Sequence, residues 1–234
     1  MANESSPDST ALVQVHYWRG RGCAEPLRMI LAAAQVPFVN TFITSGADLA
    51  ALRAQGKLAY GQVPLVEMTD GTCLVQTQAA LRSLARTYGL YPSPSNPADQ
   101  YLCDCIMEAC KDARGILMSF PFALECDKTK VASMFKYDRF AGHWNSILQR
   151  HGNKYMLGEL PSVADVVVFE VLDFYEDVMG RDAVAIDFKP YPALLAHFNH
   201  MNTFGNIAAW KAEREQQFLD WATYATVVRE TLDG

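Results

Sequence analysis

The spacing of hydrophobic positions over residues 12–90 changes repeatedly between strand-like and helix-like. A β-rich run at 12–17 predicts one strand and the run at 38–44 predicts another. Between them, hydrophobic residues recur at i, i+3, i+4 and i+7, which predicts an amphipathic helix: Leu27, Ile30, Leu31 and Ala34. Pro26 suits the first turn of this helix, because the N–H groups of that turn have no partner within the helix.

A hairpin and a further helix complete this region. The runs 64–69 and 73–76 flank Asp70-Gly71, a strong signal for a tight hairpin turn. Gly89 is placed to end the helix that follows, whose predicted inward positions are Leu81, Leu84, Ala85 and Tyr88. Residues 12–90 therefore predict the order β-α-β-(α)-β-β-α, a compact α/β domain with a mixed sheet.

Beyond a Pro- and Ser-rich linker at 91–97, the pattern predicts only helices. Ser162 followed by Asp165 is typical of a helix N-terminus, and the residues at 166–169 are apolar on every side of a helix, which predicts a buried central helix. The expected fold class is therefore α/β plus all-α, with the second domain at 98–234. Its predicted helical segments are 98–119, 129–151, 162–179, 191–201 and 206–231.

Composition and charge narrow the function. A chain of 234 residues is long for a single core, which agrees with two domains. The net charge of −6 and the lack of a basic stripe argue against a nucleic-acid or anionic-membrane partner. No apolar run reaches the roughly 18 residues of a membrane span. The polar start of the chain lacks the features of a signal peptide, so we expect a disordered tail at 1–11 and a cytoplasmic protein.

The six cysteines predict free thiols rather than disulfides or a metal site. In a reducing compartment most cysteines stay reduced. Cys103 and Cys110 share one face of a helix while Cys105 points elsewhere, and no paired CxxC or HExxH motif accompanies them. Buried thiols are the favoured interpretation, and no metal is expected.

Three segments carry a resemblance to a known family. They are 17–28 (YWRGRGCAEPLR), 62–67 with 74–77 (QVPLVE and LVQT), and 157–165 (LGELPSVAD). In this order and spacing they resemble the cytosolic glutathione S-transferases of the tyrosine-type classes, alpha above all. The resemblance implies a thioredoxin-like N-terminal domain with a four-stranded mixed sheet, a helical C-terminal domain, a homodimer, and glutathione as co-substrate without a metal.

The resemblance makes Tyr17 the residue that holds the glutathione sulfur as a thiolate. A thiol with a reference pKa of about 8.5 needs a downward shift of about 1.5 units, or roughly 2 kcal/mol, to be half ionised at neutral pH. One hydroxyl donor, helped by a helix N-terminus, is able to supply that. The alternative is a tyrosine that only packs at the end of a strand.

Further glutathione contacts are implied by the same motifs. The family has a cis proline at Pro64, which lets the backbone of Val63 pair with the cysteinyl part of glutathione; a trans proline that begins a strand is the alternative. Gln76 and Thr77 stand where a strand ends and a helix begins, which suits the γ-glutamyl carboxylate. Thr77 as a simple N-cap is the other interpretation, and the two roles are compatible. Gln62 and Arg53 are expected at the peptide and the glycine end, although Arg53 is otherwise an ordinary surface charge.

Two groups of residues are assigned to the dimer. Asp112 and Arg139 match family positions that reach the glutathione of the neighbouring subunit, and their alternatives are an intrahelical charge and a surface arginine. Tyr60 matches the aromatic residue that in several classes enters a pocket of the partner. A large aromatic side chain exposed at a loop tip is itself typical of an interaction surface.

The pocket for the second substrate is expected between the two domains and lined by apolar residues. For any one of these residues, ordinary core packing is the alternative. The candidates are Trp18, Gly22, Met118, Phe122, Phe218 and Trp221.

Cys23 departs from the family pattern, because alpha, pi and sigma members carry an arginine there. Three interpretations stay open. Arg19 or Arg21 compensates for the missing charge; Cys23 forms a mixed disulfide with glutathione; or Cys23 is only a small filler.

The resulting hypothesis is a glutathione transferase that joins the glutathione thiolate to small hydrophobic electrophiles in detoxification. Relatives also isomerise substrates or reduce peroxides through the same thiolate. The first rival is a non-catalytic protein that binds glutathione and hydrophobic ligands on the same fold. A thiol-transferase ranks last, since it normally has a cysteine in place of Tyr17.

Overall fold

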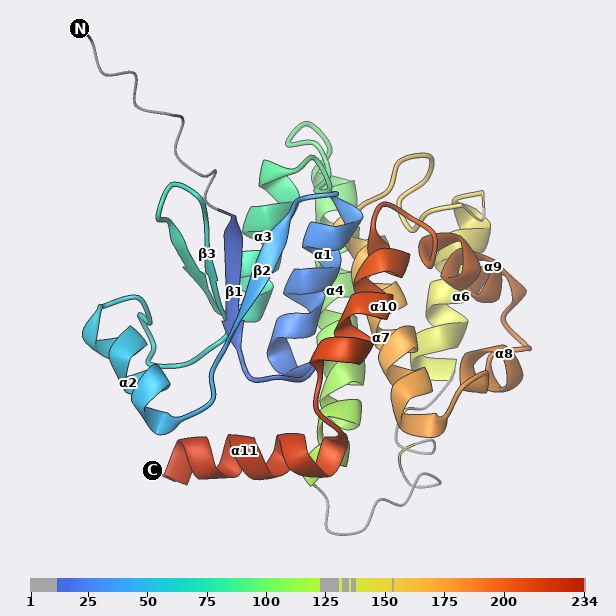
Figure 1. Cartoon of the computed structure of the whole chain (residues 1–234). Coiled ribbons are helices and arrows are strands. Elements are labelled where there is room, and N and C mark those ends of the chain that lie inside the picture. The colour runs from blue at the N-terminus through green and yellow to red at the C-terminus, as the bar shows by residue number, and fades with distance from the viewer. Residues whose placement is uncertain (1–11, 123–130, 132–134, 136–137, 153, 234) are drawn as a thin grey trace, which may run out of the picture.

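The computed structural model describes residues 12–122, 131, 135, 138–152 and 154–233. The expected tail at 1–11 and part of the expected helix at 129–151 lie outside the described residues. A small sheet occupies one side of the molecule, and helices cover the other side (Figure 1).

The sheet is four-stranded and mixed, as the sequence predicts. Its strand order is β2-β1-β3-β4, with β1 parallel to β2 and antiparallel to β3. The hairpin of β3 and β4 turns at Asp70-Gly71, where Gly71 N–H donates to the Met68 carbonyl over 2.9 Å. The strands are β1 (Val13–Tyr17), β2 (Phe38–Phe42), β3 (Leu65–Glu67) and β4 (Cys73–Val75).

Three longer helices belong to this part of the chain, and a 3-10 turn precedes the first of them. Pro26 lies in the first turn of α1, as predicted, and every residue of α1 is buried. Gly89 follows α3 with a φ of +73°, a left-handed conformation that glycine adopts easily and that ends the helix. The elements are η1 (Gly22–Ala24), α1 (Glu25–Ala33), α2 (Gly46–Ala54) and α3 (Thr77–Thr87).

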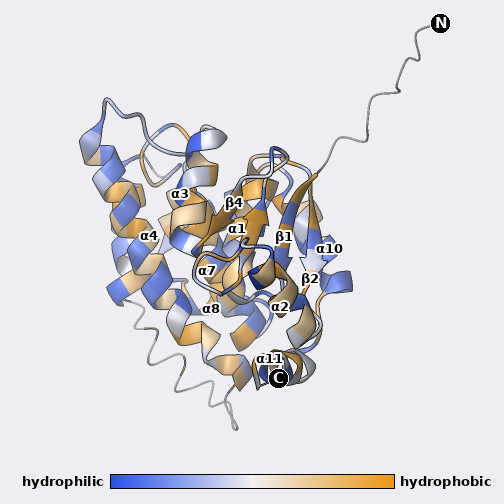
Figure 2. Cartoon of the chain, turned by 90° about the vertical axis from the view of Figure 1, so that its left-hand side faces the viewer, coloured by the Kyte–Doolittle hydropathy of each residue, from blue (hydrophilic) through white to orange (hydrophobic). Residues whose placement is uncertain are grey.

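The rest of the described chain is helical. The predicted central helix is α7, which is buried continuously from Val163 to Tyr175 and packs against α1 and α4. Hydrophobic residues gather where β1, α1 and α7 meet (Figure 2). No helix among the described residues is long and apolar enough to cross a membrane. The elements are α4 (Pro97–Met118), η2 (Phe120–Phe122), η3 (Asp138–Gly142), α6 (His143–Arg150), α7 (Val163–Met179), α8 (Ala183–Asp187), α9 (Pro192–Met201), α10 (Ile207–Gln217) and α11 (Trp221–Asp233).

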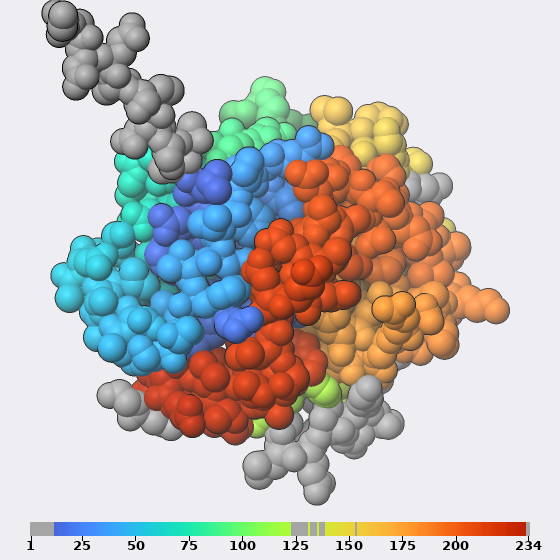
Figure 3. All heavy atoms as spheres, in the orientation of Figure 1, coloured from blue at the N-terminus to red at the C-terminus, as the bar shows by residue number. Residues whose placement is uncertain are grey.

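The prediction of one helix at 206–231 is wrong, because the chain breaks into α10 and α11. Phe218 is extended, with a ψ of 149°. The N–H of Leu219 donates to the carbonyl of Arg19 over 3.0 Å, and Asp220 caps the new helix by accepting from Ala222 N–H and Thr223 N–H. The helix α10 packs against α1, and α11 packs against α2 and η2. In Figure 3 both helices border the N-terminal segments. The short helix α8 was not predicted either.

A cluster of buried charges joins the two parts of the molecule. The guanidinium of Arg21, which precedes η1, lies 2.7 Å from Asp173 and 3.1 Å from Glu170, both on α7. Glu25 on α1 accepts from Arg214 on α10 over 2.8 Å. All five residues are nearly inaccessible to solvent. Buried charges are tolerated only when they are paired, so this cluster fixes how α1, α7 and α10 pack.

The cysteines of α4 agree with the buried-thiol interpretation. Cys103 and Cys110 are buried, whereas Cys105 on the same helix is exposed. Burial raises the pKa of Cys103 to about 12 and holds the pKa of Cys110 well above its usual range. Both side chains therefore stay protonated thiols at neutral pH.

Candidate functional site

Tyr17 is the last residue of β1, and its hydroxyl is held by the backbone that follows. The N–H of Cys23 donates to the Tyr17 hydroxyl over 2.9 Å. Gly22 lies beneath the ring with a φ of +38°, and a Cβ at this position would overlap the ring and the hydroxyl. A glycine is therefore required both by the left-handed backbone and by the close approach of the phenol.

The Tyr17 phenol is protonated over the whole neutral range. Its side chain is buried, with 4% of the residue exposed. Burial raises its pKa well above the usual value of 10.0, and the neighbouring Tyr224 raises the pKa further, whereas the hydrogen bond from the Cys23 N–H lowers it. A neutral phenol keeps its proton, so Tyr17 is able to donate a hydrogen bond to an anion.

The turn between β4 and α3 has an unusual backbone. Gln76 adopts a φ of +66°, in the region that residues other than glycine rarely occupy, at a typical cost of about 1–3 kcal/mol. The hydroxyl of the next residue, Thr77, donates to the Cys23 carbonyl over 3.0 Å. The alternative that Thr77 is a simple N-cap is wrong, because Gln76 is the N-cap and Thr77 is the first helical residue.

A cavity of about 630 Å³, which we call the Cys23 cavity, opens beside this turn. It lies between the N-terminal ends of α1 and α3 on one side and α4 on the other. Four residues predicted from the sequence meet in it, namely Gln76, Thr77, Asp112 and Met118, together with Cys23 itself. Its other lining residues are Pro26, Gln78, Lys111, Arg114 and Gly115.

Arg53 and Gln62 lie apart from the walls of the Cys23 cavity. Arg53 is exposed on α2, and its Nε donates to the Gly61 carbonyl over 2.8 Å. Gln62 is exposed in the loop that follows. The peptide bond between Val63 and Pro64 is cis.

The residues assigned to the dimer are on the surface. Asp112 on α4 and Arg139 in η3 form an ion pair of 3.1 Å, and each side chain is more than half exposed. Asp112 therefore pairs with another element rather than within its own helix. Tyr60 is 70% exposed.

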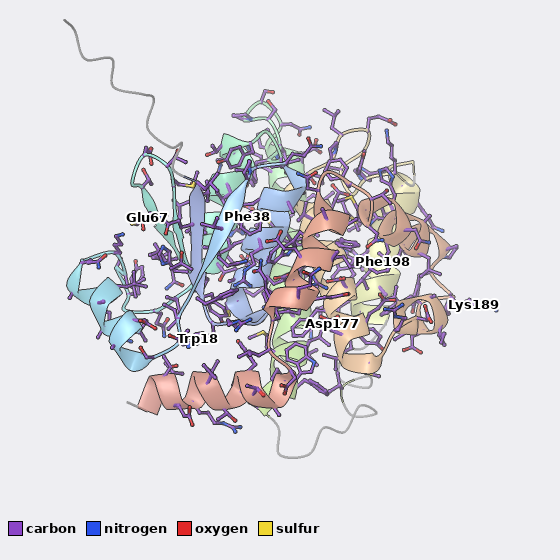
Figure 4. All side chains as sticks on the ribbon, in the orientation of Figure 1. Trp18, Phe38, Glu67, Asp177, Lys189 and Phe198 are labelled. Atoms are coloured by element: carbon purple, nitrogen blue, oxygen red, sulfur yellow. The ribbon has the colours of Figure 1, made fainter. Side chains whose placement is uncertain are left out.

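The six residues assigned to the second substrate do not meet in one cleft. Met118 lines the Cys23 cavity, whereas Phe218 and Trp221 line another cavity of about 360 Å³. Trp18 is buried with its ring edge against Tyr17, 4.9 Å between centroids, close to the end of the sheet that faces α11 (Figure 4). Phe122 is half-buried 6.0 Å from the ring of Tyr224, and Gly22 lies beneath Tyr17.

The cation beside Cys23 is neither Arg19 nor Arg21. Arg21 is engaged by the carboxylates of α7, and the Nε of Arg19 donates to the Gln217 carbonyl over 2.9 Å. Arg114 from α4 donates to the carbonyl of Gly22 and interacts electrostatically with Cys23. Sequence analysis did not select Arg114, and nothing in the spacing along α4 points to it.

Tyr224 on α11 is a further residue that the sequence did not indicate. It is 2% exposed, and it is one of the neighbours that raise the pKa of Tyr17. A Cβ at Gly20 would overlap the Tyr224 ring, so the glycine permits this contact.

Comparison with known proteins gives a consistent picture. Residues 112–214 match the family model described as glutathione S-transferase, C-terminal domain. The chain is 36% identical over 168 residues to glutathione S-transferase A3 of Homo sapiens, covering 70% of this chain and 74% of that protein. It is 33% identical over 187 residues to glutathione S-transferase A1 of Bos taurus, covering 79% and 78%. The pi-class glutathione S-transferase of Onchocerca volvulus has a similar fold, with a TM-score of 0.73 at 24% identity over 88% of this chain and 95% of that one.

Proposed function

This chain belongs to the glutathione S-transferase family, and on that premise we propose that it conjugates the glutathione thiolate to hydrophobic electrophiles. The observation that carries the proposal is the Tyr17 hydroxyl, which accepts a hydrogen bond from the N–H of Cys23, a residue that lines the Cys23 cavity. Detoxification is the general role of such an activity.

Tyr17 favours the ionised form of the bound thiol. The thiol of glutathione loses its proton to solvent, and the Tyr17 O–H donates to the remaining thiolate. A hydrogen bond to a charged group contributes about 1.5–3 kcal/mol, close to the roughly 2 kcal/mol that a thiol needs to be half ionised at pH 7. The sulfur then attacks an electrophilic carbon, a C–S bond forms, and the leaving group departs with its electron pair.

The glutathione peptide runs from the Cys23 cavity toward α2. The N-terminal end of α3 and the turn at Gln76 and Thr77 present backbone N–H groups to the γ-glutamyl carboxylate, where the helix dipole favours an anion. Val63 pairs through its backbone with the cysteinyl part, and Gln62 and Arg53 serve the glycine end. The exposed positions of Arg53 and Gln62 support this direction.

The electrophile binds next to the sulfur, with Met118 as the apolar residue of the Cys23 cavity. Phe218 and Trp221 serve a larger substrate that extends into the cavity at the junction of α10 and α11. Trp18 and Phe122 act through packing, because Trp18 is buried against Tyr17 and Phe122 lies beside Tyr224.

The proposal also includes a cytoplasmic location and two domains, at 12–90 and 98–234, joined by a linker at 91–97.

The active unit is a homodimer in which Asp112 and Arg139 reach the glutathione of the partner subunit. Their mutual ion pair is exposed, so either side chain is free to exchange partners at low cost. Tyr60, a large apolar side chain in contact with solvent, supports an interface at the α2 side.

Asp112→Ala tests the shared site. We expect weaker glutathione binding in a dimeric protein, because a polar contact from the partner is lost. Calorimetric affinity and sedimentation mass are the measurements, with Asp99→Ala at the start of α4 as the matched control. Unchanged affinity in a monomeric protein would refute the shared site.

A non-catalytic binding protein is the second candidate. Cys23 favours it, since this position lacks the fixed positive charge of the related transferases. Arg114 opposes it, because a guanidinium from α4 lies beside Cys23. The pKa of the bound thiol separates the two: a transferase lowers it and a sequestering protein leaves it unchanged.

Tyr17→Phe tests the proposed chemistry. We expect a higher pKa of the bound glutathione thiol and a fall in kcat/KM of at least about tenfold, equivalent to about 1.4 kcal/mol. The measurement is the thiolate difference absorbance of bound glutathione against pH, together with the conjugation rate. Tyr101→Phe, on the exposed face of α4, is the matched control. A titration identical to that of the wild type would remove Tyr17 from the mechanism.

A further inference from the structure

One peptide group joins Gly22 to Cys23, and both of its ends are hydrogen-bonded. At one end, the Cys23 N–H donates to the Tyr17 hydroxyl over 2.9 Å. At the other end, the Gly22 carbonyl accepts from Nη2 of Arg114 on α4. The next carbonyl along the chain, that of Cys23, accepts from the Thr77 hydroxyl over 3.0 Å. The backbone that binds the Tyr17 hydroxyl is therefore held by side chains from two other helices, α3 and α4.

Arg114 is itself fixed by a carboxylate of the core. Its Nε donates to one oxygen of Glu170 on α7 over 2.9 Å, and its Nη2 lies 3.3 Å from the other oxygen. The Arg114 side chain is 10% exposed and the Glu170 side chain is 1% exposed. The helices that carry them, α4 and α7, run side by side (Figure 1). A planar guanidinium bound at two points has little freedom, so Nη2 stays directed at the Gly22 carbonyl.

The hydrogen bonds run in one direction, from Arg114 to the proposed thiolate. The guanidinium donates to the peptide carbonyl, and the N–H of the same peptide donates to the Tyr17 oxygen. The Tyr17 O–H then donates to the sulfur, as in the proposed function. In such a chain each bond polarises the next and strengthens it by about 10–30%. A cation is an effective first donor, because a charge-assisted hydrogen bond is roughly twice as strong as a neutral one.

We propose that Arg114 is a positioning residue for glutathione conjugation, which acts through the Gly22–Cys23 peptide to strengthen the hydrogen bond from Tyr17 to the thiolate. This inference rests on the proposed function. It gives a buried arginine of the helical region a role in the chemistry of the N-terminal region. It also supplies a cation from another element to a site in which position 23 carries no fixed positive charge.

The charges around Arg114 leave it able to polarise this peptide. Glu170 is shared with Arg21, whose Nη2 lies 3.1 Å from the carboxylate, so the acid does not neutralise Arg114 alone. Lys111 and Asp112 of α4 line the same cavity. Burial lowers the pKa of Arg114, but Glu170 outweighs this effect and the pKa is raised. The guanidinium therefore stays charged at every pH at which the glutathione thiol is titrated.

The test is the pKa of the bound glutathione thiol in the wild type and in Arg114→Gln, read from the thiolate absorbance against pH. Arg114→Gln keeps an amide donor but removes the cation, and Arg21 remains as a partner of Glu170. We expect a rise of about half a unit in the thiol pKa and a fall of about threefold in kcat/KM, because the first bond of the chain loses its charge.

Arg114→Lys is the milder change for folding, because it keeps a cation opposite Glu170. We expect a smaller rise in the thiol pKa than in Arg114→Gln, since an ammonium retains the charge but lacks the rigid fork that reaches both partners. This variant keeps the inference testable even if Arg114→Gln does not fold.

Two further measurements separate this role from packing. The Cys23 amide proton reports on the peptide in the absence of glutathione, and its NMR resonance is expected to move upfield in Arg114→Gln because the N–H becomes less polarised. In the Tyr17→Phe background, Arg114→Gln is expected to have no further effect on the thiol pKa, because the chain to the sulfur is already broken.

Arg82→Gln is the matched control. Arg82 on α3 also binds carboxylates of a neighbouring helix, at 2.8 Å from Asp104 and 2.9 Å from Glu108 on α4. It makes no printed contact with the Gly22–Cys23 peptide, so its loss weakens the attachment of α4 without altering the chain of hydrogen bonds. We expect the thiol pKa and the Cys23 amide resonance to match those of the wild type.

The outcomes are distinct. A low wild-type thiol pKa that both Arg114 variants leave unaltered would overturn this inference and leave the proposed function standing. Equal rises with and without the Tyr17 hydroxyl would also overturn it, because the cation would then act on the sulfur directly. Equal rises in Arg114→Gln and Arg82→Gln would assign the effect to the packing of α4 instead. A wild-type thiol pKa equal to that of free glutathione would overturn the proposed function and this inference with it.

Discussion

Single small residues decide how the tyrosine site is built. Gly22 makes room for the Tyr17 ring and hydroxyl, and Gly20 makes room for the Tyr224 ring. The sequence motif identifies Tyr17 and Gly22, but it assigns Gly22 to the hydrophobic substrate. In the structure, the contact of Gly22 is with Tyr17 itself. Its role is therefore to place the phenol, which the motif alone does not reveal.

His16, the neighbour of Tyr17 on β1, illustrates how burial changes a titratable residue. It is 5% exposed, and Glu67 lies 3.4 Å from its Nε2. Burial lowers its pKa from the usual 6.5, and Lys57 lowers it further, whereas Glu67 opposes them. The unfolded chain therefore binds this proton at a higher pH than the folded chain does. It follows that the free energy of unfolding falls as the pH drops below about 6.5, until the folded pKa is passed.

We expect His16→Gln to flatten this pH dependence. The wild type should lose stability between about pH 7 and about pH 5 with a slope of at most about 1.4 kcal/mol per pH unit from this residue, and the variant should lose less. Urea unfolding at the two pH values measures the difference, with His143→Gln on the exposed face of α6 as the control. A variant that loses as much stability as the wild type would assign the slope to other groups.

At the scale of elements, the same capping motif appears in two environments. In α2, Asp48 accepts from Ser45 N–H over 2.9 Å at an exposed helix end. In α7, Asp165 accepts from Ser162 N–H over 2.8 Å, and its other oxygen accepts from Met156 N–H over 2.7 Å in the buried core. The sequence predicts the motif at Ser162 from local spacing alone. It does not indicate that Asp165 also contacts the loop at Met156 and His197 on α9.

We expect removal of the two carboxylates to have unequal effects. Asp48→Ala should lower the free energy of unfolding by about 0.5–1 kcal/mol, the usual value of an exposed cap. Asp165→Ala should cost about 3 kcal/mol or more, because several buried donors lose their acceptor. Denaturant unfolding of both variants at neutral pH measures the contrast. Equal losses would mean that the contacts of Asp165 beyond the cap contribute little.

At the scale of the whole molecule, buried charges connect the sheet-bearing part to the helices. Burial alone would raise the pKa of Asp173, but Arg214, Arg21 and Lys211 outweigh it and hold the pKa well below the usual range. These partners come from the start of η1 and from α10. Because its folded pKa is depressed, this carboxylate contributes stability above the unfolded pKa of about 3.8 and loses it as the pH falls through the folded value.

We expect Asp173→Ala to lower the free energy of unfolding by about 3–5 kcal/mol at neutral pH, because it leaves buried cations without a partner. Asp104→Ala removes a half-exposed partner of Arg82 and should cost about 1 kcal/mol or less. Denaturant midpoints of the two variants measure the comparison. Similar small losses in both would show that the remaining acids, Glu170 and Asp177, suffice to balance the cluster.

The sequence by itself determined the elements and part of the site. Runs of strand-forming residues predicted the strands, the helical hydrophobic period predicted α1, and the capping residues with the apolar stretch at 166–169 predicted α7. The turn at Asp70-Gly71 and the stop at Gly89 followed from residues with special backbone preferences. These features are local, since they depend on neighbours within about four positions along the chain. Family motifs added Tyr17, Gln76 and Thr77, which the structure places around Cys23.

Tertiary structure alone decided the rest. The break before α11 depends on a hydrogen bond from Leu219 to Arg19, and the surroundings of Tyr17 depend on Arg114 and Tyr224. Tertiary packing also separated the expected substrate residues, because Met118 lines one cavity while Phe218 and Trp221 line another. Each of these contacts joins residues far apart in sequence. Such contacts follow from how the whole chain packs and satisfies its buried polar groups, and local patterns carry no information about them.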